Sequence, residues 1–306
     1  MSELTNEQIE KNFAEIHPLM SQSEALQEAN RCLYCYDAPC TRACPTHIDV
    51  PSFIKKIASG NIIGSAKTIF DANPIGSSCA KVCPVEVLCE GACVEKTLVK
   101  KPIEIGRLQR YATEHTLQTG KVLFEKGQPN GKSVGIIGSG PAGLSCAAYL
   151  ARLGYAVTVY EKRELPGGLD TYGMAEYKMT QEQSLVEVRQ IEKLGVNFKV
   201  NTIVANDYKN QELMQELMTE ESKVAGDWSV MPLEKMLEAH DAVFLGVGLG
   251  KTSNLNIAGE NLHGVMDALH FIQKVKARKW KTVPQGKTVV VIGAGNTAID
   301  AVTQAK

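Results

Sequence analysis

Apolar residues recur at three- and four-residue intervals in the first part of the chain, as they do on the buried face of an amphipathic helix. Two such stretches fill residues 51–72, and the Gly60-Asn61 pair between them predicts two short helices. The spacing also predicts a helix over 24–31 and another from about Pro102 to Leu117. No strand-like alternation interrupts this pattern, so we expect the region to be mostly helical.

The pattern changes after a linker at 126–132, whose Gly, Pro and Asn residues mark a boundary. A short apolar strand is predicted at 133–138, followed by a helix over 142–153 and a second strand over 156–160. Strand, helix and strand in this order form a βαβ unit, which indicates a parallel sheet.

Two later apolar runs extend this α/β pattern. Residues 241–247 predict another buried strand, and residues 287–293 predict the start of a second strand–loop–helix unit that runs to Lys306. A dinucleotide-binding domain needs more residues than this second unit offers, so we expect the sequence to be part of a longer protein. We also expect residues 287–306 to be poorly supported by themselves, because one strand and one helix cannot bury their own apolar faces.

Charge and composition exclude some classes of protein. The net charge of −1 gives no reason to expect nucleic acid or an anionic membrane as a partner. The polar N-terminus lacks the features of a signal peptide, and no apolar run approaches the roughly 18 residues of a membrane span. The expected compartment is therefore the cytoplasm.

Cysteine is the unusual component. The chain of 306 residues has nine cysteines, and eight of them fall between Cys32 and Cys93. A cytoplasmic chain keeps its thiols reduced, so metal binding is a better interpretation than a disulfide framework. The eight residues form two clusters, in which the first has the spacing C-x2-C-x4-C-x3-C-P from Cys32 and the second has C-x3-C-P-x4-C-x3-C from Cys79.

This spacing is typical of iron–sulfur proteins. A Cys-Pro pair that ends a run of cysteines often belongs to a neighbouring cluster, and both Cys44-Pro45 and Cys83-Pro84 fit that arrangement. Two clusters with interleaved ligands would lie close enough to relay electrons. Structural zinc is the alternative, although zinc sites generally use two short-spaced pairs. The ninth cysteine, Cys146, is expected to be a small buried apolar residue, and His47 a loop residue.

A glycine-rich motif, G-S-G-P-A-G from Gly138 to Gly143, follows the first predicted strand and opens a helix. This is the context of the dinucleotide fingerprint, in which the glycines allow a tight turn, the approach of a pyrophosphate and close packing of helix on strand. Glu161 ends the next strand, where an acidic side chain would hold a ribose hydroxyl.

A second copy of the motif, G-A-G-N-T-A, begins at Gly293. No residue that would read the ribose follows it, so the choice between NAD and NADP stays open. Two dinucleotide folds in one chain suggest FAD in one and a nicotinamide in the other. A flavin can also mediate between a two-electron hydride and one-electron clusters.

These motifs together resemble the N-terminal half of dihydropyrimidine dehydrogenase, which many bacteria make as a separate flavin/iron–sulfur subunit. The resemblance rests on the first cysteine cluster with its Cys-Pro, on Asn73-Pro-Ile-Gly, on the second cluster from Cys83 to Cys93, on Ile103-Glu-Ile-Gly-Arg-Leu-Gln109 and on the segment from Pro166 to Gly173. The small subunit of glutamate synthase shares this plan, with a differently spaced cysteine region.

The resemblance implies a fold and a set of site residues. The fold is a helical, ferredoxin-like iron–sulfur domain over 1–128 and an α/β Rossmann-type FAD/NAD(P)-binding fold, incomplete at its C-terminus. The latter comprises the first part of a FAD-binding domain over 129–286 and the start of an NAD(P)-binding domain over 287–306. One 4Fe-4S cluster would be held by Cys32, Cys35, Cys40 and Cys93, and the other by Cys44, Cys83, Cys89 and Gln109. FAD would lie on Gly138, Ser139, Gly140, Pro141, Ala142, Gly143, Glu161, Gly168 and Leu169, and the nicotinamide on Gly293, Gly295, Asn296 and Thr297.

The spacing by itself nominates Cys79 in place of Gln109, so these two residues compete for the last position. The function that the resemblance implies is a relay from NAD(P)H through FAD and two clusters to a partner subunit. That partner would carry FMN and further clusters, reduce uracil or thymine, and form a hetero-oligomer with this chain. The alternatives are the glutamate synthase small subunit, a ferredoxin–NADP electron-bifurcating subunit, or a non-catalytic zinc-binding interaction module.

Overall fold

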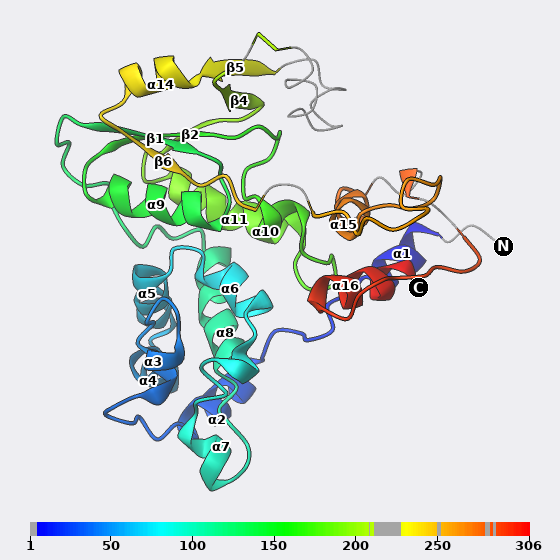
Figure 1. Ribbon diagram of the computed structural model, residues 1–306. Helices are drawn as coiled ribbons and strands as arrows, with labels where there is room; N and C mark the ends of the chain where they lie inside the picture. The colour runs from blue at the N-terminus through cyan, green and yellow to red at the C-terminus, as the bar shows by residue number, and fades with distance from the viewer. Residues whose placement is uncertain (1–4, 208, 211–227, 250–251, 279–281, 284–285) are drawn as a thin grey trace. The chain divides into compact units, whose positions relative to one another are not determined.

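The computed structural model describes residues 5–207, 209–210, 228–249, 252–278, 282–283 and 286–306 (Figure 1). The chain forms two compact units. The first, called the helical unit below, comprises His17–Lys126 with Arg189–Leu194, and the second, the α/β unit, comprises Met1–Ile16, Gly127–Val188 and Gly195–Lys306.

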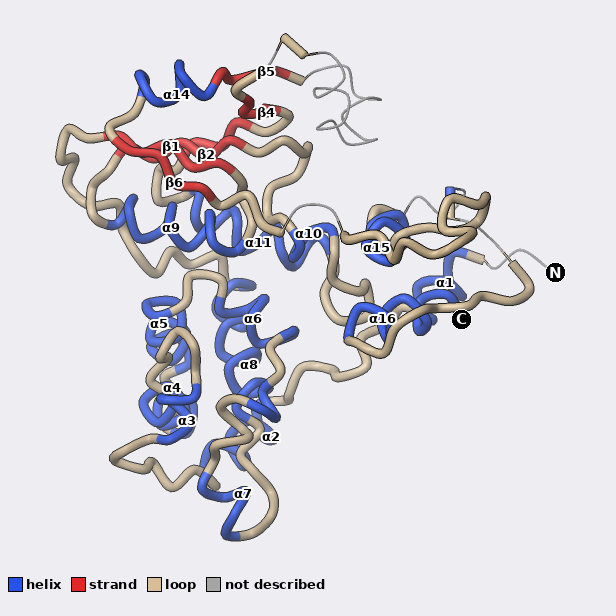
Figure 2. The backbone as a smooth tube through the Cα atoms, viewed as in Figure 1, coloured by secondary structure: helices blue, strands red, loops and turns tan. Residues whose placement is uncertain are grey.

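Helices and loops make up the described part of the helical unit, as the sequence predicts (Figure 2). The predicted helices are confirmed with small shifts of their ends, and three of them begin at a residue whose side chain caps the helix. Ser21 forms a capping box with Glu24, and Asp49 and Asn61 accept backbone N–H bonds at the starts of their helices. The elements are α2 (Gln22–Asn30), α3 (Pro39–Ala43), α4 (Val50–Ala58), α5 (Ile62–Ala72), α6 (Gly76–Val82), the 3₁₀ turn η1 (Val85–Val87), α7 (Val94–Leu98) and α8 (Ile105–Gln118).

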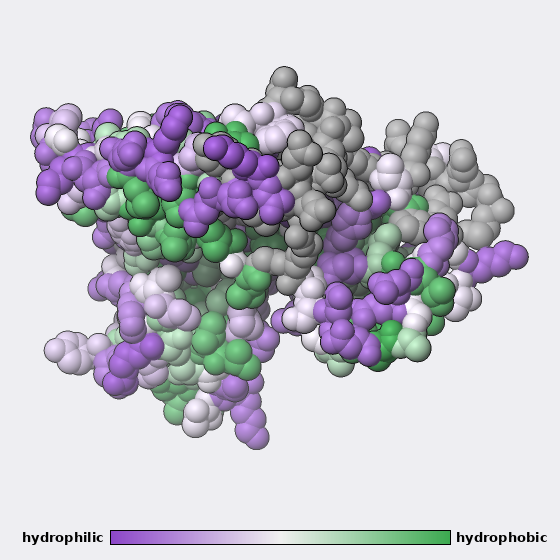
Figure 3. Space-filling model, turned by 45° about the horizontal axis from the view of Figure 1, so that its top comes forward, coloured by the Kyte–Doolittle hydropathy of each residue, from purple (hydrophilic) through white to green (hydrophobic). Residues whose placement is uncertain are grey.

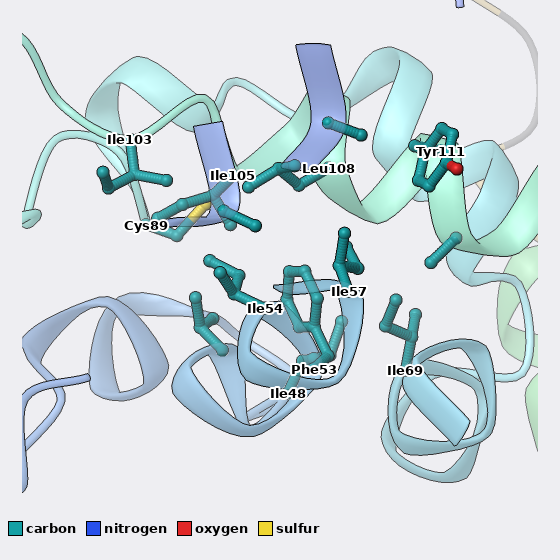
Figure 4. Packing of buried hydrophobic residues seen from close by; sticks show 14 of the residues in the cluster. Ile48, Phe53, Ile54, Ile57, Ile69, Cys89, Ile103, Ile105, Leu108 and Tyr111 are labelled. Atoms are coloured by element: carbon teal, nitrogen blue, oxygen red, sulfur yellow. The ribbon is translucent and has the colours of Figure 1, made fainter. Parts of the chain in front are cut away.

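The core of the helical unit lies between α4, α5 and α8, whose apolar side chains point toward one another (Figure 4). Phe53, Ile54, Ile69 and Leu108 are fully buried in it. Cys89 belongs to the same cluster, so at least one of the predicted ligands is anchored in the core itself.

The α/β unit contains a parallel sheet of β1 (Ser133–Ile137), β2 (Ala156–Tyr160), β3 (Asn197–Lys199) and β6 (Ala242–Leu245), in the order β3-β2-β1-β6. Helix α9 (Pro141–Arg152) packs on one face of the sheet, and α14 (Leu233–Ala239) lies on the other (Figure 1). The predicted βαβ unit is therefore confirmed as β1 (Ser133–Ile137), α9 (Pro141–Arg152) and β2 (Ala156–Tyr160). The other elements are α1 (Asn6–Asn12), α10 (Leu169–Tyr172), α11 (Gln181–Glu192), β3 (Asn197–Lys199), the parallel pair β4 (Thr202–Ala205) and β5 (Ser229–Pro232), α14 (Leu233–Ala239), β6 (Ala242–Leu245), α15 (Ala268–Lys276) and α16 (Asn296–Ala305).

Two expectations about strands are wrong. The strand at 241–247 forms as β6, but it is not buried, since Leu245 is 67% exposed. It is an edge strand that pairs only with β1 among the described strands. The strand expected at 287–293 is absent from the described residues there, which form no ladder with a neighbouring strand and leave Val290 82% exposed.

The surface drawn in Figure 3 mixes hydrophilic side chains with exposed hydrophobic ones. None of the helices in the described ranges has the length and apolar character needed to cross a membrane.

Candidate functional site

Four thiols of the helical unit surround one small cavity. Cys32 and Cys35 reach it from the loop after α2, and Cys40 reaches it from α3. Cys93 is the N-cap residue of α7. The remaining lining is mostly apolar, and it includes Val50, Pro51, Ile54, Ile103 and Ile105. The structure thus brings together the four cysteines that the resemblance assigns to one cluster.

Burial in this cavity disfavours the charged form of the thiols. It raises the pKa of Cys40 to about 11, with a smaller contribution from the neighbouring Cys32 and Cys93. The pKa of Cys32 is raised by the same cause. Thiolates are the ligands of iron–sulfur clusters, so the binding of iron must displace protons from these side chains.

The second set of predicted ligands also gathers in the helical unit. Cys44 ends α3, Cys83 ends α6, and Cys89 lies between η1 and α7. Burial raises the pKa of Cys89 to about 12, and the charges of Glu90, Cys83 and Cys44 add to the shift. The thiols of Cys44 and Cys83 are therefore near enough to Cys89 for their charges to act on it.

The two competitors for the remaining position lie side by side. The thiol of Cys79 shares a hydrogen bond with Cys83, which raises the pKa of Cys79 and lowers that of Cys83. The amide of Gln109 also bonds to Cys79, and its Nε2 donates to the carbonyl of Gly76 at 2.8 Å. Gln109 is buried on α8 and faces α6, so both residues border the second set.

The donor chemistry fits an iron–sulfur cluster, because four thiols line the cavity and the rest of its wall is apolar except for Glu95. Within the part of the chain that the structure describes, no three His, Cys, Asp or Glu side chains are arranged to hold a single metal ion. The exposed His47 lies in a loop, as predicted, and Cys146 is only partly buried on α9, less than expected.

The first glycine motif lies at the carboxyl end of β1 and leads into α9. A Cβ at Gly143 would lie 2.0 Å from the carbonyl oxygen of Gly138, so only glycine lets the helix pack this closely on the turn. A Cβ at Gly140, the N-cap of α9, would meet nothing closer than 4.0 Å. Apart from the Cα of Gly168, no neighbouring atom covers this position at the helix N-terminus, so a pyrophosphate can approach the backbone and the cradle fits a dinucleotide.

The other predicted flavin residues border this turn. Glu161 is buried at the end of β2, and its carboxylate accepts a hydrogen bond from the backbone N–H of Ser139 at 2.9 Å. Gly168 caps α10 with φ 59°, and Leu169, the first residue of α10, is 45% exposed. Pro141 and Ala142 form the first turn of α9.

The second glycine motif is the exposed turn before α16. Gly293 has φ 129°, Gly295 is the N-cap, and Asn296 and Thr297 are the first two residues of the helix. The loop and the helix of this unit are thus present, without the expected strand before them.

Several contacts were not foreseen from the sequence. Gly246 follows β6 and lies so close that a Cβ at Gly138 would meet its carbonyl oxygen at 2.4 Å. Buried Lys276 of α15 donates to the carbonyl of Asp170 at 2.6 Å, and Tyr177 donates to Asp300 of α16 at 2.6 Å. Gly246 could have been found from the sequence, because it is a glycine that directly follows the apolar residues of a predicted strand. The Lys276–Asp170 and Tyr177–Asp300 contacts join residues 106 and 123 positions apart, and no local pattern predicts them.

The burial of Lys276 and Asp170 alters both pKa values. Burial raises the pKa of Asp170 to about 6, and the Lys276 charge opposes that rise. It lowers the pKa of Lys276 to about 8, against the attraction of Glu176 and Asp170.

Comparison with known proteins matches each unit to a family. Residues 9–121 match the family described as dihydropyrimidine dehydrogenase domain II, 4Fe-4S cluster, and residues 132–306 match pyridine nucleotide-disulphide oxidoreductase. The two matches support iron–sulfur clusters, FAD and NAD(P)H as cofactors, and a helical iron–sulfur domain followed by a Rossmann-type fold.

Curated relatives align with almost the whole of this chain. The chain is 35% identical over 293 residues to the NAD-dependent dihydropyrimidine dehydrogenase subunit PreT of Escherichia coli K12, covering 95% of this chain and 64% of the relative. It is 33% identical over 301 residues to the NADPH glutamate synthase small chain of Halomonas elongata, covering 95% of this chain and 58% of the relative. The chain thus spans less than two thirds of the length of these relatives. With its second match extending over more than half of its residues, the chain belongs to the pyridine nucleotide-disulphide oxidoreductase family.

Proposed function

We propose that this chain is the electron-transfer subunit of an NAD(P)-dependent dihydropyrimidine dehydrogenase, in which electrons pass from NAD(P)H through FAD and two 4Fe-4S clusters to a partner subunit. The observation that carries the proposal is the four-thiol cavity in a chain that also has the glycine cradle at β1. The relative PreT, named as a dehydrogenase subunit, favours uracil or thymine as the final substrate and a hetero-oligomer with a catalytic partner.

In this proposal the cysteine side chains hold the clusters in two sets. Cys32, Cys35, Cys40 and Cys93 hold one cluster against the apolar wall of the cavity. Cys44, Cys83, Cys89 and Gln109 hold the other, beside Cys79. The apolar lining excludes water from the sulfur atoms, which is one means by which a protein sets a cluster's potential.

The α/β unit binds the two dinucleotides. The open backbone at Gly140 and the N-terminus of α9 receive the pyrophosphate of FAD, Glu161 accepts from a ribose hydroxyl, and Gly168 and Leu169 border the flavin. Gly293, Gly295, Asn296 and Thr297 offer the nicotinamide coenzyme a second helix N-terminus at α16. Bound FAD supplies the conversion of a two-electron hydride into single electrons that clusters carry. The domain limits at 128 and 286, and a cytoplasmic location that keeps the thiols reduced, belong to the same proposal.

The test uses the full-length protein, purified without oxygen together with the partner that co-purifies. NADH and NADPH oxidation is followed with uracil or thymine, and reduction of an artificial one-electron dye serves as the control for a loaded relay. We expect pyrimidine-dependent oxidation by one coenzyme. Dye reduction with no response to either pyrimidine contradicts the substrate assignment and leaves the relay standing.

The glutamate synthase small subunit is a second candidate, because a relative of that name aligns with 95% of this chain. The same preparation is offered 2-oxoglutarate with glutamine. Coenzyme oxidation that depends on this pair, and not on pyrimidines, would assign the chain to glutamate synthase.

A further inference from the structure

A buried hydrogen-bond network connects three separate loops of the candidate FAD site. Ser139 is fully buried, and its hydroxyl donates to Glu161 Oε2 at 2.5 Å, while its backbone N–H donates to the same oxygen at 2.9 Å. The backbone N–H of Gly167 then donates to the Ser139 hydroxyl and to the Ser139 carbonyl, each at 3.1 Å. One side chain thus joins the glycine loop after β1, the end of β2 and the Gly-Gly loop before α10.

The network determines how Glu161 is placed. Its Oε2 accepts both Ser139 bonds, and its Oε1 accepts the backbone N–H of Arg163 at 3.0 Å. A carboxylate offers about four acceptor positions, so roughly one remains for a ribose hydroxyl. Because Glu161 is only 6% exposed, it cannot turn toward a ligand without breaking these bonds.

The backbones of two glycine loops also touch. A Cβ at Gly168 would lie 2.6 Å from the Cα of Gly140, so a side chain at Gly168 would collide with the other loop. The Ser139 bonds to Gly167 lie one residue earlier in each loop. A shift of either loop therefore displaces both the other loop and the carboxylate of Glu161.

We propose that Ser139 is a positioning residue for dinucleotide binding: its hydroxyl fixes Glu161 and the Gly167–Gly168 loop in their binding arrangement before the adenosine half of the coenzyme arrives. The inference rests on the proposed function only in taking this cradle as the site for FAD. Such an arrangement favours binding, since the loops need no further ordering when the ligand enters.

The experiment measures Kd values of the full chain for FAD, ADP and 2′,3′-dideoxy-ADP, which lacks both ribose hydroxyls. In the unmodified chain we expect ADP to bind more tightly than the dideoxy compound. Ser139→Ala should weaken FAD and ADP binding about tenfold, the effect of roughly one lost hydrogen bond to a charged group. The preference for ADP over dideoxy-ADP should also decrease in this variant, because the Glu161 carboxylate that bonds the ribose hydroxyl is no longer held in place.

Ser133→Ala is the matched control. The Ser133 hydroxyl bonds to the Asp241 carboxylate at 3.3 Å at the opposite end of the same strand, β1, so this variant removes a similar bond away from the cradle. We expect it to leave all three Kd values unchanged. Thermal melting of both variants separates lost binding from lost folding.

Glu161→Gln and the double variant approach the network from its other side. If Ser139 acts through Glu161, adding Ser139→Ala to Glu161→Gln should reduce the ribose preference no further. A Ser139→Ala chain that is less stable but keeps its ribose preference would show a merely structural role and overturn the inference. An unmodified chain that binds neither FAD nor ADP would instead refute the proposed flavin site.

Discussion

The helical unit and the α/β unit build their candidate sites from different parts of the chain. The helical unit uses side chains, with thiols on loops and short helix ends around a core of large aliphatic residues. The α/β unit uses its backbone, with glycines that leave room for a ligand and one buried acid that is hydrogen-bonded in place. The first site should therefore depend on which atoms are present, and the second on the space left between backbone segments.

The largest effect is expected from Cys89→Ser. Cys89 packs within the core of the helical unit, and in the proposal it holds the second cluster (Figure 4). A serine offers a poor ligand for iron, so the variant should lose one of two four-iron clusters and about half of its iron. Iron and acid-labile sulfide analysis of the anaerobic protein measures this.

Cys146→Ser is the control for that prediction, because Cys146 lies on α9 of the other unit. It should keep the full iron content. Equal iron content in the Cys89→Ser and Cys146→Ser variants would exclude Cys89 as a ligand.

A pair of glycine variants tests the backbone site. In Gly143→Ala the new methyl group would lie 2.0 Å from the Gly138 carbonyl oxygen, so the turn and α9 must separate. We expect a loss of several kcal/mol in the free energy of unfolding, as for other overpacked positions, together with loss of FAD. Urea unfolding and flavin content measure both effects.

Gly140→Ala sharpens the same comparison, because a Cβ there meets nothing closer than 4.0 Å within the protein. This variant should unfold like the unmodified chain and yet bind FAD more weakly, since the methyl group occupies the space for the pyrophosphate. Unaltered FAD affinity in Gly140→Ala would mean that the coenzyme does not approach this backbone.

Local patterns predict much of both units and fail where neighbours decide. The ends of α4 and α5 follow from their apolar spacing and from Asp49 and Asn61, and β1 and β2 follow from their apolar runs. The exposure of β6 could not be predicted, because an apolar run does not reveal that its strand lies at the edge of the sheet. The same limit applies to residues 287–293, whose composition favours a strand but whose described structure lacks a partner strand.

The candidate sites show the same division. Cysteine spacing and the glycine motifs drew attention to the residues around each candidate site, because the chemistry needs those residue types at those separations, while the division into two ligand sets came from the family resemblance. The Ser139 network and the Lys276–Asp170 contact depend on segments that meet only in the fold. The contact between Cys79 and Gln109 likewise depends on the fold, since it requires α6 to pack on α8.

The buried pair on α10 and α15 gives the α/β unit a pH response. Burial raises the pKa of Asp170 from 3.8 to about 6, so the folded state holds this proton more tightly than the unfolded state. This contribution to stability is complete below about pH 4 and is lost as the pH rises through about 6. In the unmodified chain, the free energy of unfolding should therefore fall by about 3 kcal/mol at most between pH 4 and pH 6. In Asp170→Asn this fall should be absent.

Urea unfolding at several pH values, followed by near-UV circular dichroism, measures that difference. Glu238→Gln is the control, because it removes a carboxylate from an exposed position on α14 of the same unit. The Asn variant should have a flatter profile than the control between about pH 4 and 6. Parallel profiles would show that the Asp170 carboxyl is accessible to water in solution.

The smallest effect is expected where the two competing ligands meet. Gln109 bonds to both Cys79 and the carbonyl of Gly76, so Gln109→Leu removes a polar group from the second set while the cysteines remain. If Gln109 is the fourth ligand, both clusters should still form, but one should change its reduction potential, which an anaerobic titration followed by EPR detects. Cys79→Ser should leave both clusters and both potentials unchanged.

Thr116→Val, which removes a buried hydroxyl about two turns further along α8, controls for disturbance of the helix. Loss of one cluster in Cys79→Ser, with normal potentials in Gln109→Leu, would reverse the assignment: the second site would then be an all-sulfur site, and spacing alone would have identified it.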